Sequence, residues 1–298
     1  MATLHRLINI GHVSNNLHYN KNVNTDTNMQ HKTVLITGAT DGLGQQVALR
    51  LAQMDAHVII HGRNPEKALR VQQEIISNTG NQQVEFLIAD LQSLAQVRSL
   101  ATEVMQRTSK LDVLINNAGV FMPRRKLSLD GHEMTFAVNH LAPFLLTTLL
   151  LDLLKKSAPA RVVTVSSVGH KYVYLNPTDL QGKHFFWNWV AYCRSKLLNI
   201  LFTFELARRL KGSGVTANAV HPGVIRETNL AKTAWIKFGI GLEEGAESIV
   251  HLAVSPTVEG ISGKYFHHKD IGKPSPIAYV KKLQRKLWQL SAAMTGVY

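Results

Sequence analysis

The stretch Val34-Leu35-Ile36-Thr37-Gly38-Ala39-Thr40-Asp41-Gly42-Leu43-Gly44 decides the fold. Its three leading apolar residues predict a short buried strand, and the apolar residues after Gly44 recur at helical spacing. The three glycines allow a tight turn, a close approach of the backbone to a pyrophosphate, and close packing of the helix on the strand. The spacing differs from the G-x-G-x-x-G fingerprint, so this turn alone fits a nucleotide site and a plain connection equally well.

The next apolar run, residues 57–61, predicts a second strand that ends at Gly62-Arg63-Asn64. An NAD site places an acidic residue about 20 residues beyond the glycine turn, whereas a 2′-phosphate calls for a cation. No acidic residue occurs between Val58 and Asn64, and Arg63 stands at this place. If a dinucleotide binds, the pattern favours NADP(H); the alternative is a surface arginine at the end of a strand.

Further strand and helix signals alternate along the chain and predict one α/β domain. We expect strands at 84–88, 113–115 and 162–165, a helix at 94–105, and a single long helix over 133–156. This alternation indicates a single doubly wound, Rossmann-type parallel sheet with helices on both faces. Polar residues follow three of the strands, and the carboxyl ends of parallel strands form the ligand crevice in such sheets. These residues are Asp90-Leu91, Asn116-Asn117-Ala118-Gly119 and Ser166-Ser167.

Tyr192 and Lys196 open a long predicted helix and form the strongest local signal for chemistry. A spacing of four residues places both side chains on one helix face. A phenol with a pKa near 10 is a poor proton donor or acceptor at neutral pH until a nearby cation stabilises its phenolate. Lys196 is suited to supply this cation, which would make Tyr192 a general acid and base. Tyr-x-x-x-Lys is nevertheless common by chance, so the pair alone also fits a structural role.

The composition excludes several other classes of protein. The 298 residues are 45% hydrophobic and 18% charged, which is typical of a globular protein and not of a disordered chain. The single cysteine, Cys193, excludes an intramolecular disulfide and a cysteine-cluster zinc site. The 14 histidines lack carboxylates at ligand spacing, so we expect no metal. No stretch approaches the ~20 apolar residues that span a bilayer.

The formal net charge of the chain, 33 − 20 = +13, does not by itself identify the kind of anionic partner that the protein binds. No nucleic-acid-binding module is recognisable, so we expect no nucleic acid partner. Residues 279–290 predict an amphipathic helix that carries the cations Lys281, Lys282, Arg285 and Lys286. This helix fits docking onto its own domain and also a peripheral contact with a membrane or partner. Residues 1–30 lack periodicity and predict a flexible extension. We expect a cytoplasmic protein, because these residues lack the apolar core of a signal peptide. The sequence leaves open whether the protein forms a homo-oligomer.

Taken in order, these motifs resemble the short-chain dehydrogenase/reductase family across nearly all of residues 32–265. The resemblance is strengthened by Asn139 in Phe136-Ala137-Val138-Asn139-His140 and by His221-Pro222-Gly223, and residues 191–223 look like the retinol dehydrogenase-like branch. It implies that residues 31–298 form one domain of this family with a substrate-covering loop at 225–240, here called the substrate loop. It also implies an NADP(H)-dependent oxidoreductase that acts on a carbonyl/alcohol pair, with a lipophilic aldehyde, ketone or retinoid-like substrate.

The resemblance assigns a role to each residue of a catalytic tetrad. Tyr192 transfers the proton, Lys196 lowers the pKa of Tyr192 and holds the nicotinamide ribose, Ser167 polarises the carbonyl, and Asn139 anchors a water that leads to Lys196. Ser167 is preferred to Ser166 because the reactive serine of the family is the second of the pair. The implied cofactor contacts are Gly38, Thr40, Asp41, Gly42, Leu43, Gly44, Arg63, Asp90, Leu91, Asn117, Ala118, Gly119, Tyr192, Lys196, Pro222, Gly223 and Thr228.

Two features depart from the pattern of the family. Retinoid-active animal relatives usually begin with a hydrophobic anchor, whereas residues 1–30 are polar, which argues against a membrane-embedded retinoid role. The interval from Ser167 to Tyr192 is long and rich in aromatic residues, which fits an apolar substrate pocket and, equally, packing beneath a loop. The alternatives to an enzyme of this kind are a catalytically idle NADP-binding sensor or adaptor and a nucleotide-sugar epimerase, which needs a larger C-terminal domain.

Overall fold

One eight-stranded sheet organises the chain, in the order β3-β2-β1-β4-β5-β6-β7-β8. The computed structural model describes residues 29–297, so the extension predicted for residues 1–30 lies almost wholly outside the described residues. Neighbouring strands from β3 to β7 run parallel, and β8 pairs antiparallel with β7. The strands are β1 Thr33–Ile36, β2 His57–Gly62, β3 Val84–Ile88, β4 Val113–Asn116, β5 Ala160–Val165, β6 Val215–His221, β7 Tyr265–His267 and β8 Asp270–Ile271.

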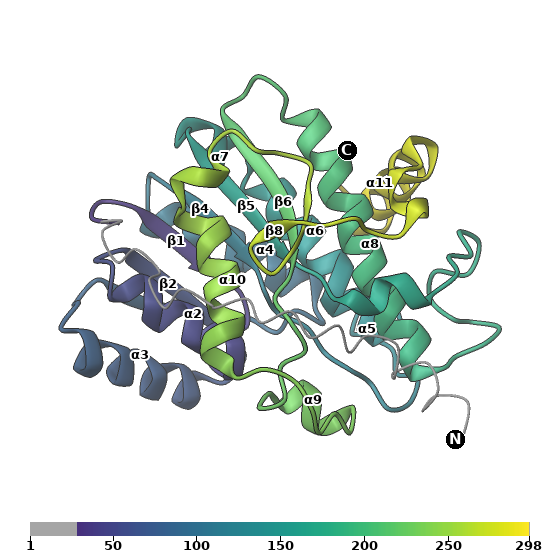
Figure 1. Cartoon of the computed structure of the whole chain (residues 1–298), viewed down its shortest axis with the longest axis horizontal. Helices are drawn as coiled ribbons and strands as arrows, with labels where there is room; N and C mark the ends of the chain where they lie inside the picture. The colour runs from purple at the N-terminus through teal and green to yellow at the C-terminus, as the bar shows by residue number, and fades with distance from the viewer. Residues whose placement is uncertain (1–28, 298) are drawn as a thin grey trace, which may run out of the picture.

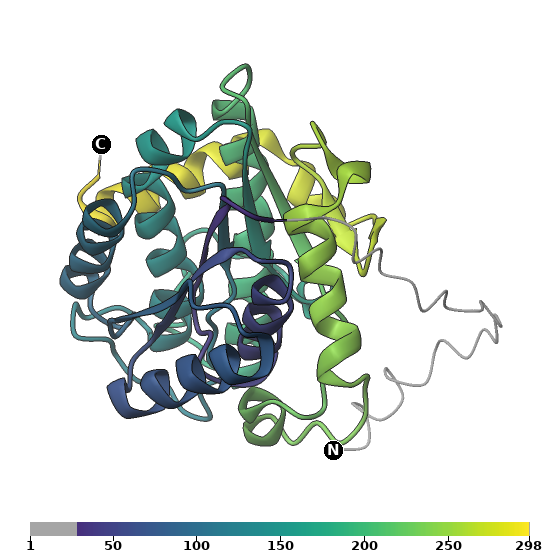
Figure 2. The same cartoon turned by 90° about the vertical axis from the view of Figure 1, so that its left-hand side faces the viewer.

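Helices cover both faces of this sheet, which confirms the predicted fold class (Figure 1; Figure 2). Helices α2, α3 and α10 lie on one face, and α4, α6, α8 and α11 lie on the other. The α-helices are α2 Gly42–Ala52, α3 Pro65–Thr79, α4 Leu94–Arg107, α5 Met134–Phe136, α6 Ala142–Leu149, α7 Leu151–Lys156, α8 Asn188–Arg209, α9 Asn229–Thr233, α10 Leu242–Val254 and α11 Lys281–Thr295. The remaining helical turns are the π-helix η1 Ala137–Leu141 and the 3₁₀ turns η2 Val168–Tyr172, η3 Pro256–Val258 and η4 Pro276–Tyr279.

The first strand shows why continuous apolar runs form this sheet. Val34 and Ile36 pack into the core with α2 and α10, whereas Leu35 packs into the core on the opposite face with α4 and α6. All three side chains are fully buried because successive residues of a strand point to opposite faces. Strand order reverses between β1 and β4, which are neighbours in the sheet. The glycine turn after β1 and the segment after β4 therefore meet at the switch point where such sheets bind ligands.

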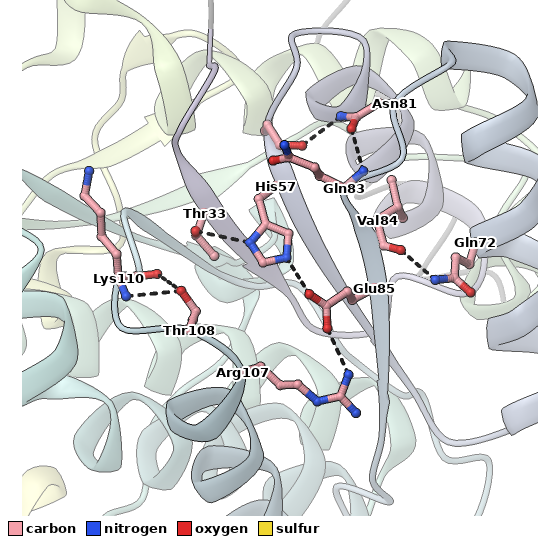
Figure 3. A network of polar contacts seen from close by, with 11 residues as sticks. Thr33, His57, Gln72, Asn81, Gln83, Val84, Glu85, Arg107, Thr108 and Lys110 are labelled. Atoms are coloured by element: carbon pink, nitrogen blue, oxygen red, sulfur yellow. Dashed lines mark hydrogen bonds and ion pairs between the residues drawn. The ribbon is translucent and has the colours of Figure 1, made fainter.

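A polar network holds the starts of the strands at the opposite edge (Figure 3). The imidazole of His57 lies 2.8 Å from Glu85 and 3.4 Å from the Thr33 hydroxyl, which links β1, β2 and β3. Arg107 at the end of α4 donates to the same Glu85 carboxylate at 2.9 Å. This network lies away from the polar residues at the carboxyl ends of the strands, so we infer that it stabilises the sheet and takes no part in ligand binding.

The prediction of one long helix over 133–156 is wrong. The segment is divided into α5, the π-turn η1, α6 and α7. Glu133 caps the start, since its two carboxylate oxygens accept from the N–H groups of Thr135 and Phe136 at 2.8 Å. Pro143 lacks the N–H that would bond to the carbonyl of Asn139 in an α-helix, which interrupts the α-helical pattern there. The resulting π-turn contains Asn139, and such turns are frequent at functional sites.

The C-terminal helix also differs from its predicted bounds of 279–290. The 3₁₀ turn η4 precedes it, and α11 continues to Thr295, where Gly296 ends it with φ of 66°. Leu287, Ser291 and Thr295 are buried, so α11 docks onto its own domain against α8 and α6. Its four predicted cations remain exposed on the other side.

Candidate active site

The turn between β1 and α2 requires its glycines. Gly38 and Gly42 have φ of 64° and 50°, a region that residues with a Cβ rarely adopt. A Cβ at Gly44 would lie 2.2 Å from the Gly38 carbonyl oxygen, so only glycine fits there. The N-cap residue Asp41 makes no side-chain hydrogen bond to the start of α2, so the first backbone N–H groups and the positive dipole end of this helix remain available to an anion.

A residue of β2 and the segment directly after β4 hold this turn in place. The amide of Asn117 donates to the carbonyl oxygens of Thr37 and Gly38 at 2.9 and 3.0 Å, and a Cβ at Gly38 would lie 2.9 Å from the Ala118 Cα. His61 accepts from the Gly38 N–H at 3.2 Å through Nδ1. The Asn117 side chain thus serves the turn, and its direct contact with a cofactor stays a prediction.

His61 was missed from the sequence, where it reads only as a strand residue. It is buried, and its Nε2 lies 3.0 Å from the carbonyl oxygen of Ala89 after β3. Burial lowers the pKa of His61 to about 4, so its imidazole is neutral at pH 7. A neutral ring that accepts at Nδ1 and donates at Nε2 satisfies both contacts.

Two cations, Arg63 and Lys67, lie between the end of β2 and the first turns of α3, together with the acidic residue Glu66. Arg63 follows β2 directly and is exposed, and Lys67 lies in the first turns of α3. The Lys67 ammonium donates to the Asp41 carboxylate at 2.6 Å, which connects α3 to the glycine turn. Thr40 of the glycine turn packs closely against β2, since a Cβ at Gly62 would lie 2.4 Å from Cγ2 of Thr40. The predicted cofactor residues Thr40 and Asp41 therefore contact β2 and α3, respectively.

The segment after β3 lies at the same edge of the sheet. The Asp90 carboxylate accepts from the backbone N–H and the side-chain amide of Gln92, at 3.1 and 2.6 Å. Leu91 is buried in the core beside α4. The predicted contacts of Asp90 and Leu91 with an adenine are not tested by these interactions and stay predictions.

The substrate loop leaves β6 and returns to the glycine turn. Gly223 has φ of 103°, and Pro222 precedes it at the end of β6. Thr228 caps α9 by accepting from the Ala231 N–H at 3.0 Å, and its methyl carbon would be 3.3 Å from a Cβ at Gly42. Asn229 donates to Asp41, so α9 is tied to the turn by a hydrogen bond as well. Trp235 and Phe238 of the loop are exposed.

Helix α8 brings the predicted tyrosine and lysine to the ends of β4 and β5. The Lys196 ammonium is buried, donates to the Val165 carbonyl oxygen at 3.1 Å, and lies 5.7 Å from the centroid of the Tyr192 ring. Burial lowers the pKa of Lys196 to about 8. Burial is also the largest influence on Tyr192 and raises its pKa, which a hydrogen bond with Ser167 opposes. The lowering of the Tyr192 pKa by Lys196 stays a prediction.

Asn139 and Gly119 complete the surroundings of Lys196. A Cβ at Gly119 would lie 3.4 Å from the Lys196 ammonium and 3.6 Å from the Asn139 side-chain oxygen. The Asn139 amide exchanges hydrogen bonds with the backbone of Val120 at 2.7 and 3.0 Å and donates to the Ser195 hydroxyl at 3.0 Å. The π-turn, the segment after β4 and α8 are thereby joined, and the four predicted catalytic residues lie in one neighbourhood.

The two serines after β5 have different surroundings. Ser166 is buried, and its hydroxyl donates to the carbonyl oxygen of Lys196 at 2.8 Å. The Ser167 hydroxyl accepts from the Gly169 N–H at 3.2 Å, and hydrogen bonding by Ser167 lowers the pKa of Tyr192. The hydrogen of the Ser166 hydroxyl is therefore used within the protein, whereas the contact of the Ser167 hydroxyl with Gly169 is one that it accepts, which leaves its hydrogen available to a substrate. This geometry supports the choice of Ser167, whose role in catalysis stays a proposal.

Ser166→Ala is expected to reduce the free energy of unfolding by about 1 kcal/mol, the usual net value of one hydrogen bond. The reason is that the variant loses its bond to the Lys196 carbonyl oxygen while the residues around Tyr192 keep their positions. Urea titration measures the loss, and NADPH-dependent turnover should stay within about threefold of wild type. A stability unchanged from wild type would contradict the structural role of Ser166.

The aromatic residues between Ser167 and Tyr192 divide into two groups. Trp189 packs with Phe121, a residue not singled out in the sequence, at 5.1 Å between ring centroids, and Phe121 lies 5.9 Å from the Tyr192 ring. These rings form an apolar wall beside the tyrosine. The others that are large and exposed are Tyr172, Tyr174, Phe185 and Trp187.

Within residues 29–297, the arrangement of possible metal ligands and the polarity of the helices bear on metal binding and membrane insertion. No group of three or more His, Cys, Asp or Glu residues in this range has a geometry that would hold a metal ion. Within the same range, every helix is too short or too polar to cross a bilayer.

Comparison with known proteins assigns the family. The family model of the short chain dehydrogenases matches residues 32–237. The chain belongs to this family. It is 44% identical to "Retinol dehydrogenase 14" of Mus musculus, over 90% of this chain and 87% of that protein. It is 42% identical to the human "Polyprenol dehydrogenase", over 89% of this chain and 86% of that protein.

Solved structures agree with this assignment. An uncharacterized protein from Mycobacterium Paratuberculosis is 34% identical and superposes with a TM-score of 0.76, over 90% of this chain and 95% of the other. A putative short chain dehydrogenase from Escherichia coli CFT073, solved in complex with NADPH, is 26% identical with a TM-score of 0.68, over 82% and 99% of the two chains.

Proposed function

We propose that this protein is an NADP(H)-dependent oxidoreductase that moves a hydride between nicotinamide and a carbonyl/alcohol pair. The observation that carries the proposal is the convergence of Tyr192, Ser167, Lys196 and Asn139 beside the glycine turn, at the switch point of the sheet. The relatives named as retinol and polyprenol dehydrogenases and the neighbour solved with NADPH support the same chemistry.

The residues present fit this cofactor. The turn at Gly38, Gly42 and Gly44 has no room for a Cβ at Gly38 or Gly44, and its helix dipole suits a pyrophosphate. Arg63 and Lys67 place two cations where the adenosine ribose emerges in this fold, and a guanidinium suits a 2′-phosphate. At the other end, Lys196 would hold the nicotinamide ribose, with Pro222 and Gly223 close to the ring.

The side chains around Tyr192 suit proton transfer to a carbonyl oxygen. In the reducing direction, bound NADPH supplies the hydride that reaches the carbonyl carbon. The Tyr192 hydroxyl donates its proton to the carbonyl oxygen, and the Ser167 hydroxyl donates a hydrogen bond to the same oxygen, which stabilises the charge developing there. The Lys196 cation stabilises the phenolate that Tyr192 leaves behind. In the oxidising direction, Tyr192 accepts the proton of the alcohol.

The substrate is, in our proposal, a lipophilic aldehyde, ketone or retinoid-like compound. The wall of Phe121 and Trp189 beside Tyr192 offers an apolar surface to such a molecule. Exposed Trp235 and Phe238 of the substrate loop are suited to extend this surface when the loop closes. Closure would exclude water from the reacting atoms.

The test is a screen of purified protein with NADPH against aliphatic aldehydes, aromatic ketones and retinal, followed at the nicotinamide absorbance band. We expect the highest kcat/KM on long apolar carbonyls. The rival hypothesis, a catalytically idle NADP-binding sensor, predicts NADPH binding without turnover of any substrate in either direction.

The same proposal includes a cytoplasmic location, a homo-oligomer, and a peripheral membrane contact through α11. The apolar face of α11 is buried against its own domain, so a membrane contact would rely on its exposed cations. Such a contact is electrostatic and weakens with salt.

Lys282→Gln is expected to weaken binding to vesicles of phosphatidylserine and phosphatidylcholine about fivefold at low salt, since one cation near an anionic surface contributes about 1 kcal/mol. Lys156→Gln removes an exposed charge from α7 and is the control. Vesicle sedimentation measures both. Absence of binding by the wild type, or equal losses in both variants, would exclude the contact.

A further inference from the structure

His170 lies three residues after Ser167 and is fully buried. Its Nδ1 is 2.6 Å from the carbonyl oxygen of Ser167, and its backbone N–H donates to the same oxygen at 3.2 Å. Its Nε2 accepts from the backbone N–H of Ser275 at 3.1 Å. The ring also packs edge-on against Tyr265 of β7, with 4.9 Å between ring centroids.

These partners determine where the imidazole carries its proton. A backbone N–H always donates, so the Nε2 that faces Ser275 must be the unprotonated nitrogen. The proton then resides on Nδ1 and is donated to the carbonyl oxygen of Ser167. Only the neutral Nδ1–H tautomer satisfies both contacts, and a protonated Nε2 would confront the N–H of Ser275 without an acceptor. Burial favours the neutral ring as well.

The contact at the Ser167 carbonyl restricts the direction of the serine hydroxyl. The carbonyl is held by two donors from residue 170, which restricts the backbone of Ser167 at ψ of 151°. The hydroxyl oxygen is held separately by the Gly169 N–H at 3.2 Å. This turn is pressed against α8, since a Cβ at Gly169 would lie 2.9 Å from the sulfur of Cys193, the neighbour of Tyr192. Little room is left for Ser167 to adopt another position.

We propose that His170 is a positioning residue, which by donating from Nδ1 to the Ser167 carbonyl aims the serine hydroxyl at the substrate carbonyl beside Tyr192. This inference rests on the proposed function. It also gives the segment around Ser275, which lies between β8 and η4, a connection to the active site. Catalysis depends on it because a small misplacement of an orienting group lowers the rate of the chemical step.

Two substitutions at residue 170 separate the contacts of the ring. The side-chain amide of His170→Asn reaches about the position of Nδ1 and is able to donate to Ser167, whereas the longer His170→Gln reaches the position of Nε2 and serves Ser275 only. Both remove the ring and leave a similar space, so each is the control for the other in thermal unfolding. NADPH affinity should be unchanged in both, because the hydrogen bonds and ring contact of His170 within residues 29–297 involve Ser167, Ser275 and Tyr265 and not the predicted cofactor residues.

We expect kcat of His170→Asn to stay within about threefold of wild type and kcat of His170→Gln to fall about tenfold, with equal NADPH dissociation constants. Equal kcat values in the two variants, or a larger loss in His170→Asn, would overturn the proposal. ¹⁵N NMR of histidine-labelled wild type gives a readout independent of turnover, and here a proton on Nε2 of His170 would overturn it. A wild type that reduces no carbonyl refutes the proposed function, while the NMR result still decides the contact.

Discussion

Tyr192→Phe is expected to lower kcat for carbonyl reduction by about 10²- to 10⁴-fold, the usual contribution of a general acid. Phenylalanine retains the ring that packs against Phe121 and Trp189 but removes the hydroxyl that donates the proton. NADPH should bind with nearly wild-type affinity, because the glycine turn does not involve this hydroxyl. Steady-state kinetics and quenching of tryptophan fluorescence by NADPH measure the two quantities.

The matched control is Tyr174→Phe, which removes a hydroxyl from an exposed tyrosine of the segment before α8. Its kcat should equal that of the wild type. Near wild-type turnover by Tyr192→Phe would show that the proton comes from another group, and the mechanism proposed for this site would be wrong. Equal losses in NADPH affinity and kcat would instead indicate a disturbed structure.

Much of the fold was predictable because its signals are local. The apolar run before Gly38 and the helical spacing after Gly44 predict a strand, a turn and a helix, and repetition of this pattern predicts the parallel sheet. Strand β6 was not predicted, and neither were the short β7 and β8, whose two or three residues carry no measurable periodicity. The break in the helix at Asn139 was missed because the apolar spacing of 133–156 continues through it, although Pro143 was a signal for it.

The sequence predicted which residues belong to the candidate site, but it did not predict which other residues they contact. The pair Tyr192 and Lys196 and the resemblance to the family indicate an active site, and the structure brings the predicted residues to one edge of the sheet. Contacts between distant segments leave no mark in a single sequence. His61 at Gly38 and His170 at Ser275 are such cases, because each joins residues that only the folded sheet brings together.

The distinction between Ser166 and Ser167 illustrates the same limit. Adjacent serines after a strand are equivalent as sequence, and preference for the second rested on the resemblance alone. Only the folded chain shows that the Ser166 hydroxyl is bonded to the Lys196 carbonyl oxygen, whereas Ser167 lowers the pKa of Tyr192. Alternation of side chains along an extended segment is the physical origin of this difference.

Arg63→Ala is expected to weaken NADPH binding by roughly 1.5 to 3 kcal/mol, the range for hydrogen bonds to a charged group. Arg63 is exposed at the end of β2, and among residues 29–297 no ion pair engages it, whereas Lys67 is paired with Asp41. Its guanidinium is therefore the cation available to a 2′-phosphate, for which its planar geometry is suited. NADH lacks this phosphate, so its affinity should change little, and selectivity should fall by about one to two decades.

Arg70→Ala is the matched control, because it removes the same charge from the exposed side of α3, where Arg70 pairs with Glu74. It separates a specific contact from a loss of general attraction between a cationic protein and an anionic cofactor, an attraction that salt screens. Gly62 is unsuitable for adding an acidic residue, since a Cβ there would lie 2.4 Å from Thr40. Both cofactors are titrated into wild type and each variant by tryptophan fluorescence, and equal affinities of the wild type for NADPH and NADH would refute the role of Arg63.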